Sequence, residues 1–145
     1  MSLSTQSLKM VMVTYGDEQY CLNIDHVASI ERVSEITAMP DLPAEILGVI
    51  HLRGNIIPII DFGQLIGTEK ITVTDHSRIV VLQNEQGFIG LLTEAATDVI
   101  DLQTEAIQSP GISQNEESII QGVAKHKEQL IMVLNCPFIF KKTNA

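Results

Sequence analysis

Short runs of alternating apolar and polar residues recur along the chain, and this pattern predicts β-strands. The run at 8–13 (Leu-Lys-Met-Val-Met-Val) has a period of two and ends at Tyr-Gly-Asp-Glu, 15–18, so a strand, a turn and a second strand are expected there. Further short runs, most of them bounded by Gly, Asn, Asp or Glu, follow at Val27–Ile30, Ile46–Leu52, Ile56–Ile60, Arg78–Leu82, Phe88–Leu92 and Leu130–Leu134. The pattern therefore predicts an all-β fold.

Helical signals are brief. Asp61 is suited to cap a helical turn that ends near Gly67, and Pro43–Leu47 is a candidate start of another turn. Pro137 stands where the beginning of a helix tolerates proline. None of these segments is long enough to change the predicted class.

One hairpin pattern occurs twice in the chain. Thirteen residues separate Gly48 from Asp61, and the same number separates Gly122 from Asn135. Each interval begins with Gly-Val, passes through an aliphatic strand and ends at a residue that can cap a helix. We interpret the two intervals as one hairpin used twice.

A second alignment supports an internal duplication. Val27-x-x-Ile30 matches Ala96-x-x-Val99 at an offset of sixty-nine residues, and Tyr-Cys-Leu at 20–22 matches Ile-Gly-Leu at the same offset. Two related β units are expected within one domain, over about 14–70 and 75–135, with the N-terminal strand at 8–14 left open to join the second unit. The polar stretch at 68–77 is expected to connect them as an ordered surface segment.

Composition and charge exclude several classes of function. A formal net charge of −9 and an aromatic content of 4% argue against a basic or stacking surface for nucleic acid. Hydrophobic residues make up 45% of the chain, enough for a core without a metal or disulfide. The polar start and the short apolar runs indicate neither a signal peptide nor insertion into a membrane, so a cytoplasmic protein is expected.

Candidate catalytic and metal-binding groups do not form a motif. The four histidines lack the spacing of a zinc site, and no phosphate-binding loop or nucleophile elbow occurs in the sequence, so no metal and no cofactor is expected. Cys21 and Cys136 are far apart in sequence and are expected to be free thiols. Glu94 and Asp98 fit solvated carboxylates at strand edges.

One segment, 46–61, has an unusual pattern. Arg53 interrupts an apolar stretch directly before Gly-Asn, a turn dipeptide, so its side chain is expected at the corner of a hairpin. It either holds the opposite strand through Asp61 or a backbone carbonyl, or recognises a partner. Pro58 donates no backbone hydrogen bond, which predicts an edge strand or a bulge there.

The same segment carries a resemblance to a known family. Gly48–Asp61 reads G-V-I-x-L-R-G-x-I-I-P-I-I-D, preceded by Leu-Pro-Ala-Glu-Ile and followed by Phe-Gly-Gln-Leu-Ile-Gly. With Gly-Leu-Leu at 90–92 and Ile-Gln-Gly-Val at 120–123, it resembles the CheW-like adaptors of bacterial chemotaxis over about Leu8–Phe140. The resemblance implies a single CheW-like domain over 1–145, built from two SH3-like five-stranded β-barrels packed together.

The resemblance also implies a function without catalysis. Such adaptors couple transmembrane chemoreceptors, the methyl-accepting chemotaxis proteins, to the histidine kinase CheA at receptor arrays on the inner face of the membrane. The cytoplasmic tip of the receptor binds in a groove between the barrels, and the regulatory domain of the kinase binds at the barrel ends. Carried over by position, the receptor groove comprises Val27, Ile30, Gly48, Arg53, Gly90, Ala96 and Val99.

The chain departs from the family pattern at three places. Ser29 stands where V-x-E-I is common, Arg78 begins a strand that more often starts with an aliphatic residue, and Asn135 replaces an acidic residue. These differences leave open a CheW-like module from a larger adaptor or kinase in a pathway other than motility. A small β-barrel hydrolase subunit is the other alternative, and it requires His51 or His126 beside Cys21 or Cys136 in a cleft.

Overall fold

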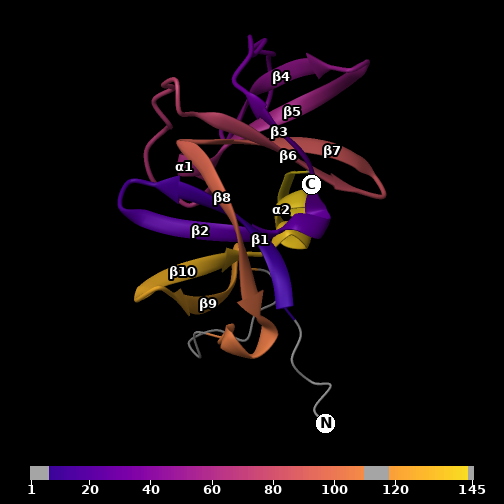
Figure 1. The fold of residues 1–145 in the computed structure, drawn as a ribbon. Helices are drawn as coiled ribbons and strands as arrows, with labels where there is room; N and C mark the ends of the chain where they lie inside the picture. The colour runs from indigo at the N-terminus through magenta and orange to yellow at the C-terminus, as the bar shows by residue number, and fades with distance from the viewer. Residues whose placement is uncertain (1–6, 110–117, 144–145) are drawn as a thin grey trace. The chain divides into compact units, whose positions relative to one another are not determined.

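The computed structural model describes residues 7–109 and 118–143, and ten of the fourteen regular elements in these ranges are strands. The all-β prediction is therefore confirmed. The elements are β1 (Ser7–Tyr15), β2 (Glu18–Asn23), η1 (Ile24–His26), β3 (Val27–Arg32), β4 (Ile46–Leu52), β5 (Asn55–Asp61), α1 (Phe62–Leu65), β6 (Arg78–Asn84), β7 (Gly87–Thr93), β8 (Ala95–Gln103), η2 (Thr104–Ala106), β9 (Ile120–His126), β10 (Gln129–Leu134) and α2 (Cys136–Thr143) (Figure 1).

The strands form two five-stranded sheets, one in each of two compact units. Unit 1 comprises Met1–Asp25 and Thr97–Ala145, and its sheet has the order β8-β1-β2-β10-β9. Unit 2 comprises His26–Ala96, and its sheet has the order β3-β6-β7-β5-β4. The N-terminal strand, left open to join the second unit, does so as β1, which lies between β8 and β2. The bounds differ from the halves expected near 14–70 and 75–135 because β2 also pairs with a late strand, β10.

The core of unit 1 is small and mostly aliphatic. Leu8, Ile100 and Ile107 pack against its edge, partly buried. The short α2 belongs to the same unit, and its Ile139 and Phe140 side chains are buried. The central cluster consists of Met10, Met12, Cys21, Leu102, Ala124, Ile131 and Val133.

Unit 2 is built from aliphatic strands and one capped helical turn. Asp61 ends β5 and caps α1, because its carboxylate accepts a hydrogen bond from the backbone N–H of Gln64 at 3.1 Å. Both oxygens of the same carboxylate accept the backbone N–H of Ile71, at 3.2 and 3.0 Å. Asp61 is only 1% exposed, so these bonds satisfy a buried carboxylate as the cap prediction requires.

Each sheet curls so that a residue following one edge strand pairs with the other edge strand. The edge strands are β3 and β4 in unit 2, and β8 and β9 in unit 1. In unit 2, Thr37 and Val49 exchange two backbone hydrogen bonds of 2.8 and 2.9 Å. In unit 1, Gln108 and Val123 do the same at 2.8 and 2.7 Å. Such bridges close a five-stranded sheet into a barrel and leave fewer unpaired backbone groups at its edges.

The two hairpins recognised in the sequence have the same structure. Ile46 pairs with Ile60 in one hairpin and Ile120 pairs with Leu134 in the other, and each pair lies beside a register shift at the same position. The capping residue also closes each hairpin in the same way. Asp61 donates its backbone N–H to the carbonyl of Glu45 at 2.9 Å, and Asn135 donates its own to Ile119 at 2.7 Å.

The predicted cap at Asn135 forms as well. Its side-chain oxygen accepts the backbone N–H of Phe138 at 3.2 Å, so an amide replaces the carboxylate used by Asp61. The helix then runs over Cys136–Thr143, with Pro137 inside its first turn. Proline is tolerated there because its missing N–H would have no partner within the helix.

Two local predictions need correction. The helical start at Pro43–Leu47 is wrong: the backbone N–H of Ile46 bonds back to the carbonyl of Pro43 at 3.0 Å as a turn, and β4 begins at Ile46. Of the two alternatives at Pro58, the edge strand is wrong, since β5 lies between β7 and β4, whereas the ladder of β4 and β5 does shift register nearby, between Ile46 and Gly48. Pro58 pairs with Val49 and stands one residue before the parallel ladder to β7, so its missing donor costs no ladder hydrogen bond.

Candidate functional site

The seven residues expected at a binding surface lie on several elements. Val27 and Ile30 are on β3, Gly48 is on β4, and Arg53 is in the turn between β4 and β5. Six of the seven belong to unit 2, and Val99 belongs to unit 1. The remaining two are Gly90 on β7 and Ala96 on β8.

The apolar members of this set repeat the same exposure pattern on two strands. On β3, Val27 is half-buried and Ile30 is 42% exposed. On β8, Ala96 is half-buried and Val99 is 51% exposed. Both strands therefore keep a branched apolar side chain in contact with water, where a residue serving only the core would be covered.

Arg53 stands at the corner of the β4–β5 hairpin, as predicted. Its φ is +48° and that of Gly54 is +82°, so these two residues form the centre of a tight two-residue turn. Its guanidinium does not reach Asp61, which caps α1. Instead, Nη1 of Arg53 donates to Oε2 of Glu31 on β3 at 3.0 Å, and the arginine side chain remains 69% exposed.

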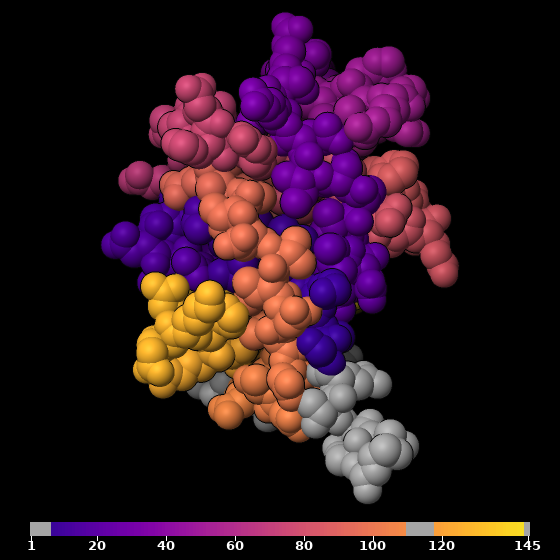
Figure 2. Space-filling model, in the orientation of Figure 1, coloured from indigo at the N-terminus to yellow at the C-terminus, as the bar shows by residue number. Residues whose placement is uncertain are grey.

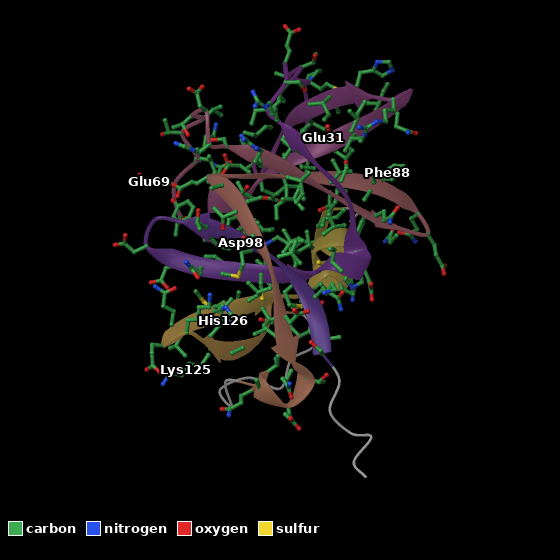
Figure 3. All side chains as sticks on the ribbon, in the orientation of Figure 1. Glu31, Glu69, Phe88, Asp98, Lys125 and His126 are labelled. Atoms are coloured by element: carbon green, nitrogen blue, oxygen red, sulfur yellow. The ribbon has the colours of Figure 1, made fainter. Side chains whose placement is uncertain are left out.

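Glu31 is a residue of this surface that the sequence analysis missed. A hydrogen bond from the Ser29 side chain and then the hydrogen bond and charge of Arg53 lower the pKa of its carboxyl group, against a smaller opposing effect of burial. Figure 3 shows Glu31 on β3. One signal in the sequence could have identified Glu31. Ser29 stands where the family pattern V-x-E-I has a glutamate, and the carboxylate of Glu31 follows two residues later.

Gly48 and Gly90 allow close packing inside unit 2. A Cβ atom on Gly48 would lie 2.2 Å from the backbone oxygen of Thr37, so glycine there permits the bridge that closes the barrel. A Cβ on Gly90 would lie 2.5 Å from Cδ1 of Ile59 and 2.9 Å from Cγ2 of Ile79. Both glycines are buried, so they contribute to a surface through the shape of their strands.

The two cysteines are poorly suited to nucleophilic catalysis. Burial raises the pKa of the Cys21 thiol to about 12. Burial, with a smaller contribution from the nearby Cys21, raises the pKa of the Cys136 thiol to about 12. Both cysteines are free and buried, so neither provides an accessible thiolate near neutral pH.

Over 7–109 and 118–143, no cluster of three or more His, Cys, Asp or Glu could hold a metal ion. Within the same ranges, no helix is long and apolar enough to cross a membrane.

Duplicated five-stranded sheets with exposed apolar side chains and a solvent-facing ion pair define a class of small β-barrel binding modules. The family model of the CheW-like domain matches residues 9–144. The chain therefore belongs to the CheW-like domain family, whose members are scaffolds without catalytic activity, and it is not an enzyme.

Individual relatives agree with this membership. The chain is 32% identical over 146 residues to the probable chemotaxis protein CheW of Rhizobium etli, covering 99% of this chain and 94% of that protein. It is 31% identical over 140 residues to the chemotaxis protein CheW of Rhizobium meliloti, covering 95% and 90%. The crystal structure of the scaffolding protein TtCheW from Thermoanaerobacter tengcongensis matches with a TM-score of 0.80 and 29% identity, over 90% of this chain and 85% of that one.

Proposed function

We propose that this scaffold is a chemotaxis adaptor that couples transmembrane chemoreceptors to the histidine kinase CheA by protein–protein binding. In this role it is recruited to receptor arrays at the inner face of the membrane, where no bond is made or broken. Its family and the names of its relatives support the proposal, since they are chemotaxis CheW proteins and one is called a scaffolding protein.

The observation that carries the proposal is the matched exposure of Ile30 and Val99. Exposed β-branched side chains at equivalent positions of an internal repeat offer apolar contact to the stripe of a receptor helix. The residues proposed to contact the receptor are these two together with Val27, Arg53 and Ala96. Gly48 and Gly90 support it by shaping the strands that carry the contacts.

Arg53 has a defined part in this proposal. Its guanidinium is held by Glu31 but largely exposed, so an incoming carboxylate or helix carbonyl can share it without removing it from its partner. An exposed charge at the rim of an interface acts mainly on the rate of association and on its salt dependence. The regulatory domain of the kinase is expected to bind at the barrel ends.

The decisive experiment measures binding to each partner separately. The folded chain is tested against the cytoplasmic tip of a chemoreceptor and against the regulatory domain of CheA, and capture of both is expected. Arg53→Ala is expected to weaken receptor binding by about 1 kcal/mol or less at low salt and to flatten its dependence on ionic strength. Kinase binding should not change.

Lys70→Ala is the matched control, because Lys70 is another exposed cation of unit 2. It removes one positive charge and should leave receptor binding and its salt dependence unaltered. Capture of neither partner by the folded protein would contradict the adaptor function. Identical receptor affinity and salt dependence for Arg53→Ala and the unmodified chain would remove Arg53 from the site.

A further inference from the structure

The tip of the β9–β10 hairpin in unit 1 is a small cationic site on an acidic chain. Lys125, His126 and Lys127 are consecutive there, while the chain as a whole carries a net charge of −9. Figure 3 labels Lys125 and His126 on this hairpin, and the space-filling view shows the hairpin, in gold, open on the visible face (Figure 2). The proposed receptor surface does not include these residues.

The repeat shows what a cation at this turn is suited to bind. Lys127 lies five residues after Gly122, as Arg53 lies five residues after Gly48, and the two have φ values of +49° and +48°. In unit 2, the turn cation Arg53 takes a carboxylate, that of Glu31, at 3.0 Å. A carboxylate is therefore the ligand that this turn geometry accepts within the molecule itself.

In unit 1 the corresponding carboxylate is missing. In the alignment that matches Val27 with Ala96, Glu31 matches Ile100. Ile100 packs against the core of unit 1. Lys127 makes no ion pair or side-chain hydrogen bond with any described residue. The nearby Glu128 pairs instead with Lys125, at 3.6 Å, and both of these side chains are largely exposed.

An apolar side chain adjoins the cations. Leu130 is 67% exposed and pairs directly across the hairpin with Lys125. On the same face, the next pair of the ladder is Met132 with Val123, both half-buried. The hairpin therefore exposes a large aliphatic side chain directly opposite the ion-paired Lys125 and close in sequence to the turn that carries Lys127.

The turn also holds an unfavourable backbone conformation. Glu128 has a φ of +67°, a left-handed conformation that side chains rarely adopt, whereas the matching position in unit 2 is Gly54. Non-glycine residues in this region are found where the local geometry serves a purpose, such as presenting a side chain to a partner. Here the geometry presents Lys127 at the outermost point of the hairpin.

We propose that the β9–β10 tip docks an acidic polypeptide segment, with a partner carboxylate on Lys127 and an apolar partner side chain against Leu130. The proposal is independent of the proposed receptor surface. A polypeptide is favoured over an anionic membrane because a single exposed leucine offers little area to bury in lipid. The Arg53–Glu31 pair provides the geometry for the expected contact.

The test is an NMR titration of the ¹⁵N-labelled full chain with the synthetic peptide Glu-Glu-Leu-Glu-Glu, blocked at both ends. Shift changes are expected to concentrate on the amides of 124–131. Lys127→Glu is expected to weaken peptide binding roughly fivefold or more, since it replaces an attraction by a repulsion. Leu130→Ser should weaken it by about threefold.

Lys142→Glu is the matched control, because it makes the same change of charge on an exposed lysine of unit 1 outside the hairpin. It should leave the peptide affinity within about twofold of the unmodified chain, as expected of a distant surface charge. Equal weakening by Lys142→Glu and Lys127→Glu would overturn the proposal, as would shift changes located outside 124–131. Sedimentation of the chain with phosphatidylserine vesicles that depends on Lys127, without binding of the peptide, would overturn it in favour of a lipid surface.

Discussion

Two neighbouring side chains, Ser29 and Arg53, lower the pKa of the Glu31 carboxyl group. The hydrogen bond from Ser29 lowers its pKa most, followed by the hydrogen bond and charge of Arg53. Because the pKa is lower in the folded chain, the interaction stabilises the fold at neutral pH, and this stabilisation is lost as the pH falls through the folded pKa. The effect on stability is small, since Arg53 is largely exposed.

We predict that Ser29→Ala raises the pKa of Glu31 toward its usual value by more than Arg53→Ala does. Carboxyl ¹³C chemical shifts, followed by NMR from pH 7 to pH 2, report the titration directly. Lys70→Ala serves as the control for a general change in charge and should leave the curve of Glu31 in place. Superimposable curves for the unmodified chain and both test variants would show that neither donor acts on Glu31.

The partner of Arg53, Glu31, could not be predicted from the sequence, although the position of Arg53 could. The corner position of Arg53 follows from the neighbouring Gly-Asn, because turn chemistry is local. Its partner was expected to be Asp61 or a carbonyl, yet Asp61 is buried under α1 and Glu31 takes the guanidinium. The pairing depends on how β3 lies beside the hairpin, which no local pattern encodes.

Cys21 and Cys136 lead to a second prediction. Both thiols have pKa values of about 12 in the folded chain, against 9.0 for an exposed thiol, so the unfolded chain releases these protons first as the pH rises. The free energy of unfolding should therefore fall above about pH 9, by up to about 1.4 kcal/mol per pH unit for each cysteine. Urea denaturation at pH 8, 9 and 10 measures this slope.

The control is the double variant Cys21→Ala, Cys136→Ala, whose free energy of unfolding is measured over the same pH range. It loses stability at every pH through the smaller core side chains, but its dependence on pH between 8 and 10 should be shallower. In the unmodified chain at pH 8, a thiol reagent should react slowly until denaturant is added. Rapid labelling of both cysteines in the native protein would contradict the assigned burial.

At the scale of elements, the duplicated hairpin was predictable and β8 was not. The Gly-to-cap spacing identified both hairpins, and the structure confirms their common register shift and cap. β8 (Ala95–Gln103) was absent from the predicted strands because Thr97, Asp98 and Asp101 interrupt the alternation of its apolar residues. It becomes a strand through pairing with β1, a non-local contact.

Opposite substitutions in the turns of the two hairpins should change the free energy of unfolding in opposite directions. Gly54 has a φ of +82°, and a Cβ added there would meet no other atom within 4 Å, so Gly54→Ala should lower the free energy of unfolding by about 1 kcal/mol through backbone strain alone. Glu128→Gly at the matching position should raise it by up to about 1 kcal/mol, since it removes the same strain. Urea denaturation at pH 7 measures both changes.

Glu128→Ala separates the two effects of this substitution. It removes the 3.6 Å ion pair with Lys125 but keeps a side chain at positive φ, so its stability should stay close to that of the unmodified chain. A stabilisation by alanine equal to that by glycine would mean that the acidic side chain, and not the backbone conformation, is responsible.

The whole molecule combines the two repeats by exchanging strands between them. In sequence, the first repeat runs from β1 to α1 and the second from β6 to α2. In space, β1 and β2 complete a sheet with β8, β9 and β10, while β6 and β7 complete one with β3, β4 and β5. Cys21 of β2 pairs with Val133, as Gly90 of β7 pairs with Ile59, so the two exchanges are equivalent.

This exchange explains why the expected unit boundaries fail. An alignment of repeats shows which strands are related, but related strands fit either sheet equally well by their pattern of apolar residues. Whether a sheet is completed from its own repeat or from the other depends on the connections between β2 and β3 and between β7 and β8. Nothing in the periodicity of the chain encodes that choice.

The exchange makes a prediction for the chain divided between its repeats. A cut between Val73 and Thr74 falls in an exposed segment, leaves Ile71 with its hydrogen bonds to Asp61, and breaks no strand. Residues 1–73 alone then hold only β1 and β2 of one sheet and lack β6 and β7 of the other, so neither sheet is complete.

Each fragment should be unfolded alone by circular dichroism, because two- and three-stranded remnants bury too little apolar surface. An equimolar mixture should recover the β spectrum and elute as a one-to-one complex, since together the fragments supply every strand of both sheets. Cooperative unfolding of fragment 1–73 by itself would mean that β1 to β5 form a self-sufficient barrel, and would contradict the exchange.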